Sequence, residues 1–238
     1  AAQVSPLRIA LNADIRSTNP GVNRDDNTDA VILHVVEGLV AYSEDSSVKP
    51  LLARSVEMSE DGRAYTFKLR DGIKFHNGAE LTADDVVWNW QRYMDPKTEW
   101  RCLPEFDGRN RMKVGSVEAA DAKTVVFRLE EPDALFLATL ARTDCGGTGI
   151  IHKESVKPDG SWDKPIGTGP FKFEEWRRGE LVRLVKFDEY ANAAEGKPDG
   201  YVGSKRPLVD EVRFIVIPDS AAAKAALLRG DIDVVPDI

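Results

Sequence analysis

Residues 59–78 read SEDGRAYTFKLRDGIKFHNG and contain three turn-forming dipeptides, Asp61-Gly62, Asp71-Gly72 and Asn77-Gly78. Asp-Gly and Asn-Gly accept positive φ and close tight hairpins between strands. Between the turns, apolar side chains alternate with polar ones, at Tyr65, Phe67, Leu69, Ile73 and Phe75. Such alternation indicates strands with one apolar face. The stretch therefore predicts a small antiparallel meander.

The segment after the meander predicts the helix that covers its apolar face. Thr82 and Asp85 have the spacing of a capping box, and Asp95-Pro96 marks the end of the helix. Apolar residues recur between them at helical spacing, at Val86, Val87, Trp90, Tyr93 and Met94. A further hairpin is predicted at residues 117–129. A ribbon that runs into an amphipathic helix is typical of α+β subdomains.

The first forty residues predict a strand, a polar loop and a helix. Leu7–Leu11 alternates as a strand, and the polar loop follows at residues 17–27. Thr28 or Asp29 can cap the next helix, which we expect to end near Gly38.

After residue 164 the pattern changes toward parallel organisation. Residues 171–176 and 181–187 predict a hairpin, and residues 212–216 predict a strand. Ser220 can cap an alanine-rich helix, and residues 232–235 predict a strand parallel to the previous one, as in a βαβ crossover. We therefore expect the middle of the chain to be inserted into a sheet that the first strand begins.

Composition limits the class of protein. The chain has 238 residues, 42% of them hydrophobic, and a net charge of −8 without a basic cluster, so nucleic acid is not an expected partner. The longest apolar stretches are too short or too interrupted to span a bilayer. The start, AAQVSPLRIA, has no initiator Met and resembles a mature exported chain, although a chain trimmed for expression would look the same.

The two cysteines, Cys102 and Cys145, leave two alternatives open. An exported chain with an even count permits a disulfide, which would stabilise the fold by about 4 kcal/mol in the chain-entropy model. Two buried free thiols fit the sequence equally well. His34, His76 and His152 share no ligand spacing, so we expect no metal site.

Four segments of this chain resemble one family in order. They are EGLV at residues 37–40, SEDGRAYTFKLRDGIKFHNGAELTADDVVWNWQR at 59–92, PIGTGPFKFEEW at 165–176 and VDEVRFIVIPDSAAAKAALLRGDIDVV at 209–235. Together they are similar to the peptide/nickel family (family 5) of extracellular solute-binding proteins that serve ABC importers.

The resemblance implies an α/β (mixed α+β) fold, a periplasmic-binding-protein-like lobe with an inserted antiparallel ribbon-and-helix subdomain. On this basis residues 1–40 begin the main lobe, 41–164 form the inserted subdomain, and 165–238 complete the main lobe up to the crossover. Family members continue there into a second lobe, which we expect to be missing from this chain.

The function implied is a receptor that captures a solute in an interlobe cleft by hinge closure and delivers it to an ABC permease. Peptides, opines, oligosaccharides and metal chelates are the implied solutes, with no cofactor and no catalysis. The location implied is periplasmic or extracellular, peripheral to the membrane, with a lipid tether as one option. A sensory or adhesion module that reuses the fold is an alternative. A secreted hydrolase with paired carboxylates is a weaker alternative, because no GxSxG or HExxH motif is present.

The resemblance also implies one wall of the cleft. Its first positions are Arg24, Asp25, Asp26, Asn27, Glu37, Gly38 and Leu39. Glu37 could pair with a ligand amine or cation, and Gly38 could let a ligand approach the backbone. The alternative is that Glu37 is a solvated helix end and Gly38 the helix stop.

Two further segments are implied near the cleft. Cys145, Gly146 and Gly147 would expose backbone groups to a ligand, or else form a plain flexible connection. Trp100 and Arg101 suit stacking and carboxylate binding, or else form an exposed loop pair without a role.

Overall fold

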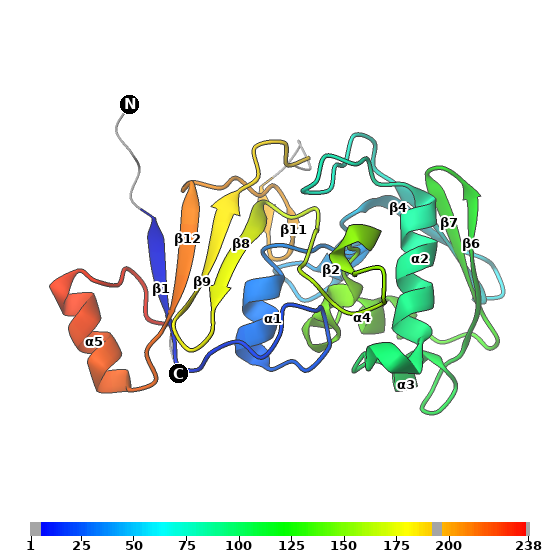
Figure 1. The fold of residues 1–238 in the computed structure, drawn as a ribbon. Helices are drawn as coiled ribbons and strands as arrows, with labels where there is room; N and C mark the ends of the chain where they lie inside the picture. Colours follow the sequence, from blue (N-terminus) through cyan, green and yellow to red (C-terminus); the bar gives the residue numbers. More distant parts are fainter. Residues whose placement is uncertain (1–5, 192–196, 237–238) are drawn as a thin grey trace.

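The computed structural model describes residues 6–191 and 197–236, and a four-stranded mixed sheet occupies one end of it. The strand order is β1 (Leu7–Leu11), β12 (Glu211–Val216), β9 (Leu181–Lys186) and β8 (Phe171–Arg177). β1 runs parallel to β12, whereas β9 is antiparallel to both of its neighbours, β12 and β8 (Figure 1). The sheet that β1 begins is therefore resumed only after residue 170, as predicted.

A second four-stranded sheet, wholly antiparallel, comes from the middle of the chain. Its order is β4 (Ala53–Met58), β5 (Ala64–Leu69), β7 (Thr124–Leu129) and β6 (Val114–Asp121). Burial alternates along β5, where Tyr65, Phe67 and Leu69 are inside, so the predicted apolar face is confirmed.

The meander does not continue past Asp71-Gly72, which corrects the prediction. Ile73 and Phe75 are buried, but the chain there forms only one isolated bridge, between Lys74 and Glu80. β5 pairs instead with β7, where Phe67 lies opposite Val125. The apolar alternation correctly predicted which side chains are buried, but the strand that hydrogen-bonds to β5 on this side is β7, from further along the chain.

The helix α2 (Ala83–Met94) covers the second sheet. Thr82 and Asp85 form the predicted capping box, and the helix ends before Asp95-Pro96. Trp90 packs edge-on against Phe127 of β7, with ring centroids 5.2 Å apart. Shorter helices flank this core: the α-helices α3 (Leu103–Phe106) and α4 (Phe136–Leu140), and the 3₁₀ turns η1 (Pro96–Thr98), η2 (Thr143–Thr148) and η3 (Lys153–Ser155).

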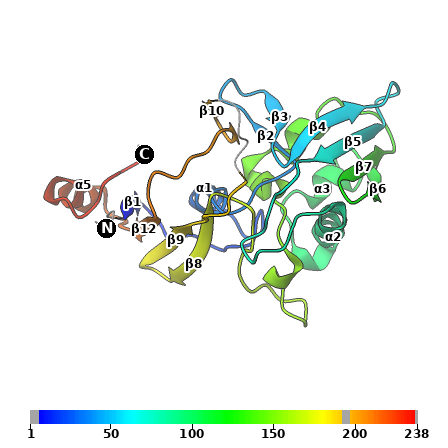
Figure 2. The ribbon, with the colours of Figure 1, turned by 90° about the horizontal axis from the view of Figure 1, so that it is seen from above.

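The helix α1 (Asp26–Ile32) differs from its prediction at both ends. Asp25 is the N-cap, because its carboxylate accepts a hydrogen bond from the Thr28 backbone N–H at 2.8 Å. Thr28 and Asp29 lie inside the helix. The helix ends well before Gly38, so Gly38 is not its stop. Seen from above, α1 lies between the two sheets (Figure 2).

At the C-terminal end, α5 (Ser220–Arg229) is capped by Asp219 and not by Ser220. Gly230 ends it in the left-handed conformation, as expected. The predicted strand at 232–235 is reduced to one parallel bridge between Val234 and Ile9. β1 therefore lies between this segment and β12, because the crossover passes over one strand position.

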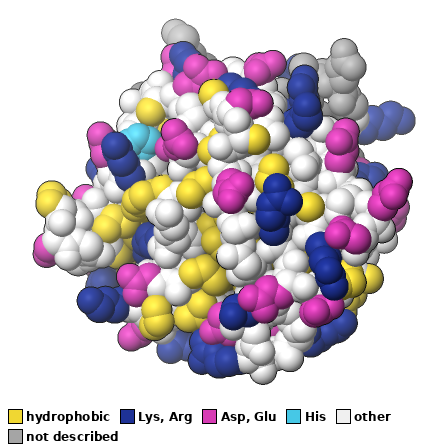
Figure 3. All heavy atoms as spheres, turned by 90° about the vertical axis from the view of Figure 1, so that its right-hand side faces the viewer, with side chains coloured by type: hydrophobic (Ala, Val, Ile, Leu, Met, Phe, Trp, Pro, Cys, Tyr) yellow, Lys and Arg dark blue, Asp and Glu magenta, His cyan; other side chains and the backbone are white. Residues whose placement is uncertain are grey.

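Two small hairpins complete the described chain: β2 (Val40–Tyr42) with β3 (Val48–Pro50), and β10 (Pro198–Asp199) with β11 (Val202–Gly203). Acidic and basic side chains are intermingled on the face shown in Figure 3. Among the residues described, no helix has the length and apolar character needed to cross a bilayer.

Candidate functional site

The predicted site segments meet at the turn η2. A Cβ on Gly146 would lie 2.6 Å from the Gly21 nitrogen, and a Cβ on Gly38 would lie 2.1 Å from the Gly147 carbonyl oxygen. Neither space can hold a side chain, so these backbones approach each other as closely as glycine allows. We call η2 together with residues 17–27, 37–39 and 100–101 the junction.

Trp100 belongs to the interior of the junction. Its side chain is buried, with 2% of the residue exposed, and its indole N–H donates to the Cys145 carbonyl oxygen at 3.0 Å. The ring stacks on Phe106, with centroids 5.6 Å apart. Trp100 therefore presents no ring face to a solute, contrary to prediction, because its N–H and ring both have partners inside. It is not an exposed loop residue either.

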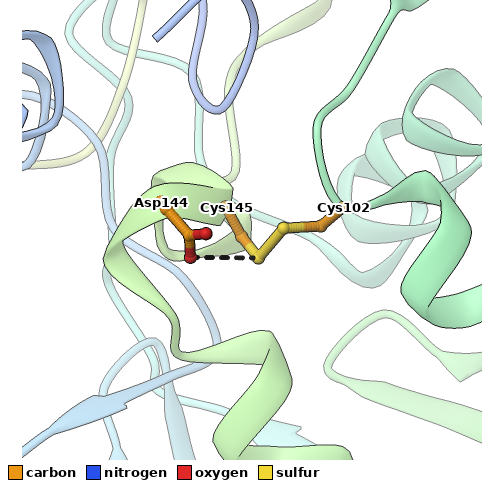
Figure 4. Close-up of side chains that lie close together, drawn as sticks. All are labelled: Cys102, Asp144 and Cys145. Carbon is orange, nitrogen blue, oxygen red and sulfur yellow. Dashed lines mark hydrogen bonds between the residues drawn. A yellow bond between two sulfur atoms is a disulfide. The ribbon is translucent and has the colours of Figure 1, made fainter. Parts of the chain in front are cut away.

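Cys102 and Cys145 form a disulfide with their Cα atoms 5.5 Å apart, which confirms that alternative (Figure 4). Both residues are fully buried, so Cys145 offers nothing to a ligand directly. Asp144 Oδ1 lies 3.9 Å from the Cys145 sulfur, a contact without a hydrogen bond because a disulfide sulfur has no proton. These three side chains have atom types that can ligate metals, but neither sulfur is available as a thiolate.

Asp144 holds two guanidinium groups, those of Arg101 in the junction and of Arg142, the residue before η2. Arg142 donates to it through Nε at 2.9 Å and Nη2 at 2.7 Å, and Arg101 Nε donates at 3.0 Å. Arg142 also contacts Glu105 at 3.2 Å. Hydrogen bonds from Arg142, followed by those from Arg101, lower the pKa of Asp144 to about 2. Just over half of the Arg101 side chain (53%) remains exposed.

A second ion cluster surrounds Arg24. Its guanidinium group binds Asp29 through Nε at 3.0 Å and through a shorter Nη2 contact, and reaches Asp26 at 2.9 Å. Hydrogen bonding to Asp29 raises the pKa of Arg24, and the nearby Asp144 carboxylate contributes to that rise. Burial raises the pKa of Asp29 despite its bonds to Arg24. The Asp26 side chain is fully exposed, so this cluster ends in a solvent-exposed carboxylate.

The remaining N-terminal candidates have structural partners. Asp25 caps α1, and Asn27 Nδ2 donates to Asn12 Oδ1 at 2.8 Å. Leu39 is buried in the larger core. Within residues 24–27, only Asp26 is fully exposed.

Glu37 is neither a ligand-facing carboxylate nor a solvated helix end, so both alternatives expected for it are wrong. Its side chain is 1% exposed and accepts hydrogen bonds from Tyr190 at 2.8 Å, Lys205 at 3.1 Å and Thr168 at 3.1 Å. Burial, followed by the charge of Glu37, raises the pKa of Tyr190. The Glu37 carbonyl accepts from the Ile150 N–H at 2.9 Å, so its backbone is extended rather than helical.

Sequence reasoning missed several members of these networks. Glu105, Tyr190 and Lys205 carry no local signal, since the partners that place them in these networks are 37 or more positions away. Arg142 and Asp144 immediately precede Cys145, Gly146 and Gly147 in the sequence, and their charges are the signal that could have identified them.

The fold and the junction define a lobe of the solute-binding class. The chain matches the family model described as bacterial extracellular solute-binding proteins, family 5 Middle, over residues 47–238. The chain therefore belongs to family 5 of the bacterial extracellular solute-binding proteins, and both the resemblance and the periplasmic-binding-protein-like fold are confirmed.

Its relatives include the oligopeptide-binding protein AppA of Bacillus subtilis. It is 36% identical over 204 residues, which cover 82% of this chain and 34% of AppA. Among solved structures, AgaA of A. tumefaciens R10 in complex with agropinic acid has a TM-score of 0.81 at 29% identity, covering 97% of this chain and 43% of AgaA. DppA of Helicobacter pylori in complex with the peptide STSA has a TM-score of 0.79 at 30% identity, covering 96% and 46%. The chain thus spans less than half the length of these relatives.

Proposed function

We propose that this chain forms one wall of the solute-binding cleft of a receptor that delivers its solute to an ABC permease. Membership of family 5 supports the receptor role, and the chain's relatives include proteins named for oligopeptide binding or solved with small organic ligands. The junction lies at the positions that the family resemblance implies for the cleft. A role in binding, without catalysis or a cofactor, fits this family.

The solute class that the junction suits best is zwitterionic and peptide-like. The observation that carries this proposal is a pair of exposed charges in the junction, the Asp26 carboxylate and the Arg101 guanidinium group. A peptide or an opine carries an ammonium group and a carboxylate, which can pair with these charges. Partly buried partners hold both: Arg24 contacts Asp26, and Asp144 contacts Arg101. An oligosaccharide or a metal chelate would use the same wall with fewer charge contacts.

We also propose how the chain divides into lobe and subdomain, and where the protein is located. Residues 1–40 and 165–238 would form the main lobe, and residues 41–164 the inserted subdomain. A periplasmic or extracellular location, with or without a lipid tether, follows from the family's role. A sensory or adhesion module with the same fold would bind the same solutes but would not support uptake, so a transport assay separates it from the receptor.

The test is an NMR titration of this chain with trialanine and with its N-acetylated, C-amidated form. We expect trialanine to shift the amide signals of residues 24–27, 101 and 143–148 with an affinity near millimolar, because one wall supplies only part of the contacts. The blocked peptide should bind more weakly. Asp26→Asn and Arg101→Gln should each weaken binding, whereas Arg229→Gln, an exposed change on α5, should not. Equal binding of both peptides would contradict the zwitterionic assignment.

A further inference from the structure

A separate hollow of about 860 Å³ lies between α2 and the segment that follows η3, and we call it the α2 hollow. Its walls include Trp88 and Arg92 of α2, together with Lys153, Lys157 and Trp162. It touches the polar 17–27 loop at Asn19 but contains none of the charged residues of the two ion clusters described above. Its volume falls in the range of about 300–1,000 Å³ that is typical of small-molecule sites.

Positive charge gathers in the α2 hollow, although the whole chain carries a net charge of −8. Its cations are Arg92, Lys97, Lys153 and Lys157, and its carboxylates are Asp95 and Asp159. Within residues 6–191 and 197–236, none of these four cations forms a salt bridge. Both carboxylates are already engaged locally, Asp95 by the Lys97 backbone N–H and Asp159 by Ser161. Four cations against two carboxylates leave the lining of the hollow with a net positive charge.

Arg92 is the most constrained of these cations. Its guanidinium carbon lies 5.0 Å from the Trp162 ring centroid, and its Nη2 donates to Asn19 Oδ1 at 3.1 Å. Its Nη1 is buried and has no acceptor in the described parts of the chain. A buried donor without an acceptor carries a free-energy cost. An incoming acceptor that reached this nitrogen after a small rotation of the guanidinium group would recover part of that cost.

The two indoles supply the apolar part of the α2 hollow. Trp88 and Trp162 are each partly exposed and pack against the smaller core beside the first sheet. The Trp162 N–H donates to Thr18 Oγ1 at 2.9 Å, which fixes its ring plane. Fixed aromatic faces beside guanidinium and ammonium groups match a ligand that has an apolar body and an anionic end.

We propose that the α2 hollow binds a small organic anion, with its carboxylate toward Arg92, Lys153 and Lys157 and its apolar or aromatic body against Trp88 and Trp162. This second site adjoins the junction at the 17–27 loop but shares none of its charged residues, and it does not rest on the proposed receptor function. Its ligand class also differs from the zwitterionic solute proposed for the junction, because a ligand of the α2 hollow needs a carboxylate and an apolar body but no ammonium group.

The experiment is an NMR titration of the chain that follows the indole N–H signals of its five tryptophans. The probe is phenylacetate, and phenylacetamide is its matched neutral control. We expect phenylacetate to shift the Trp88 and Trp162 signals, and phenylacetamide to bind at least about fivefold more weakly. Trp100, which is buried in the junction, provides an internal reference that should not move.

Variants separate charge recognition from apolar adsorption. Lys153 and Lys157 are exposed, so Lys153→Gln combined with Lys157→Gln should leave the fold intact and weaken phenylacetate binding about fivefold. Lys224→Gln, an exposed change on α5, is the matched control and should have no effect. The proposal is overturned by absence of indole shifts at about 20 mM phenylacetate, by equal binding of the amide, or by full affinity in the double variant.

Discussion

Gly38→Ala tests whether the glycine of the EGL segment serves packing or ligand access. An added Cβ would lie 2.1 Å from the Gly147 carbonyl oxygen and 3.4 Å from that of Thr148. Both are backbone atoms of η2, which the disulfide at Cys145 ties to Cys102, so neither can rotate away as a side chain would. The two segments must separate by about 1 Å to restore van der Waals contact.

The expected cost follows from this geometry. Overpacking a well-packed core costs about 1–3 kcal/mol, and we expect the upper end because the obstructing atoms belong to the backbone. Urea denaturation followed by circular dichroism measures the loss as a lower midpoint with an unchanged slope. Gly115→Ala is the matched control, since its Cβ would find its nearest atoms at 3.6 and 3.7 Å, and its stability should stay within about 0.5 kcal/mol of the parent.

A ligand-access role gives the opposite result. Gly38→Ala would then keep the stability of the parent and lose only affinity for trialanine. An unfolding midpoint for Gly38→Ala equal to that of Gly115→Ala would refute the packing argument, and with it the close approach of residues 38 and 147.

Three other measurements follow from the structure. Reduction of the Cys102–Cys145 disulfide, which joins residues 43 apart, should lower the free energy of unfolding by about 4 kcal/mol; an unchanged urea midpoint after thiol titration has confirmed reduction would count against it. Because the pKa of Asp144 is lowered to about 2, its stabilisation is present above its unfolded pKa near 3.8 and is lost as the pH falls toward 2. Asp144→Asn should therefore reduce the loss of unfolding free energy over this fall in pH by about 1 kcal/mol, after allowance for solvent screening. An unchanged loss of unfolding free energy in the variant would show that Asp144 is not responsible. Asp85→Ala should cost about 1 kcal/mol by breaking the capping box, whereas Asp84→Ala, in the same turn but outside the box, should cost only a few tenths; equal losses would argue against the box.

Local signals predicted most of the secondary structure. β5 and its turn at Asp61-Gly62 were readable because period-two alternation and positive-φ turn residues act over a few positions. The capping box of α2 was equally local. The predictions failed where pairing is long-range: the partner of β5 comes from β7, and β1 lies between β12 and Val234. Neither neighbour can be identified from short-range periodicity.

The candidate site was predictable as a set of segments but not as a set of exposed groups. The family resemblance pointed to residues that do meet at η2, yet it could not distinguish Arg101, which faces solvent, from Trp100, which does not. The Trp100 ring stacks on Phe106, and its indole N–H donates to the Cys145 carbonyl, which lies 45 positions away and is out of reach of local sequence patterns. Likewise, the partners of Glu37 come from residues more than 130 positions away.

The same contacts that hide these residues make the junction rigid. The disulfide, the backbone approach of Gly38 to Gly147 and the buried Glu37 network each fix one segment to another without using solvent-facing groups. Asp26 and Arg101 therefore project from supports whose order is established by folding, not by a solute. A wall held in this way loses little conformational entropy on binding, because its ordering cost has already been met in the folded chain. In the proposed receptor, adjustment to different solutes would then fall to the two exposed side chains and not to the backbone beneath them.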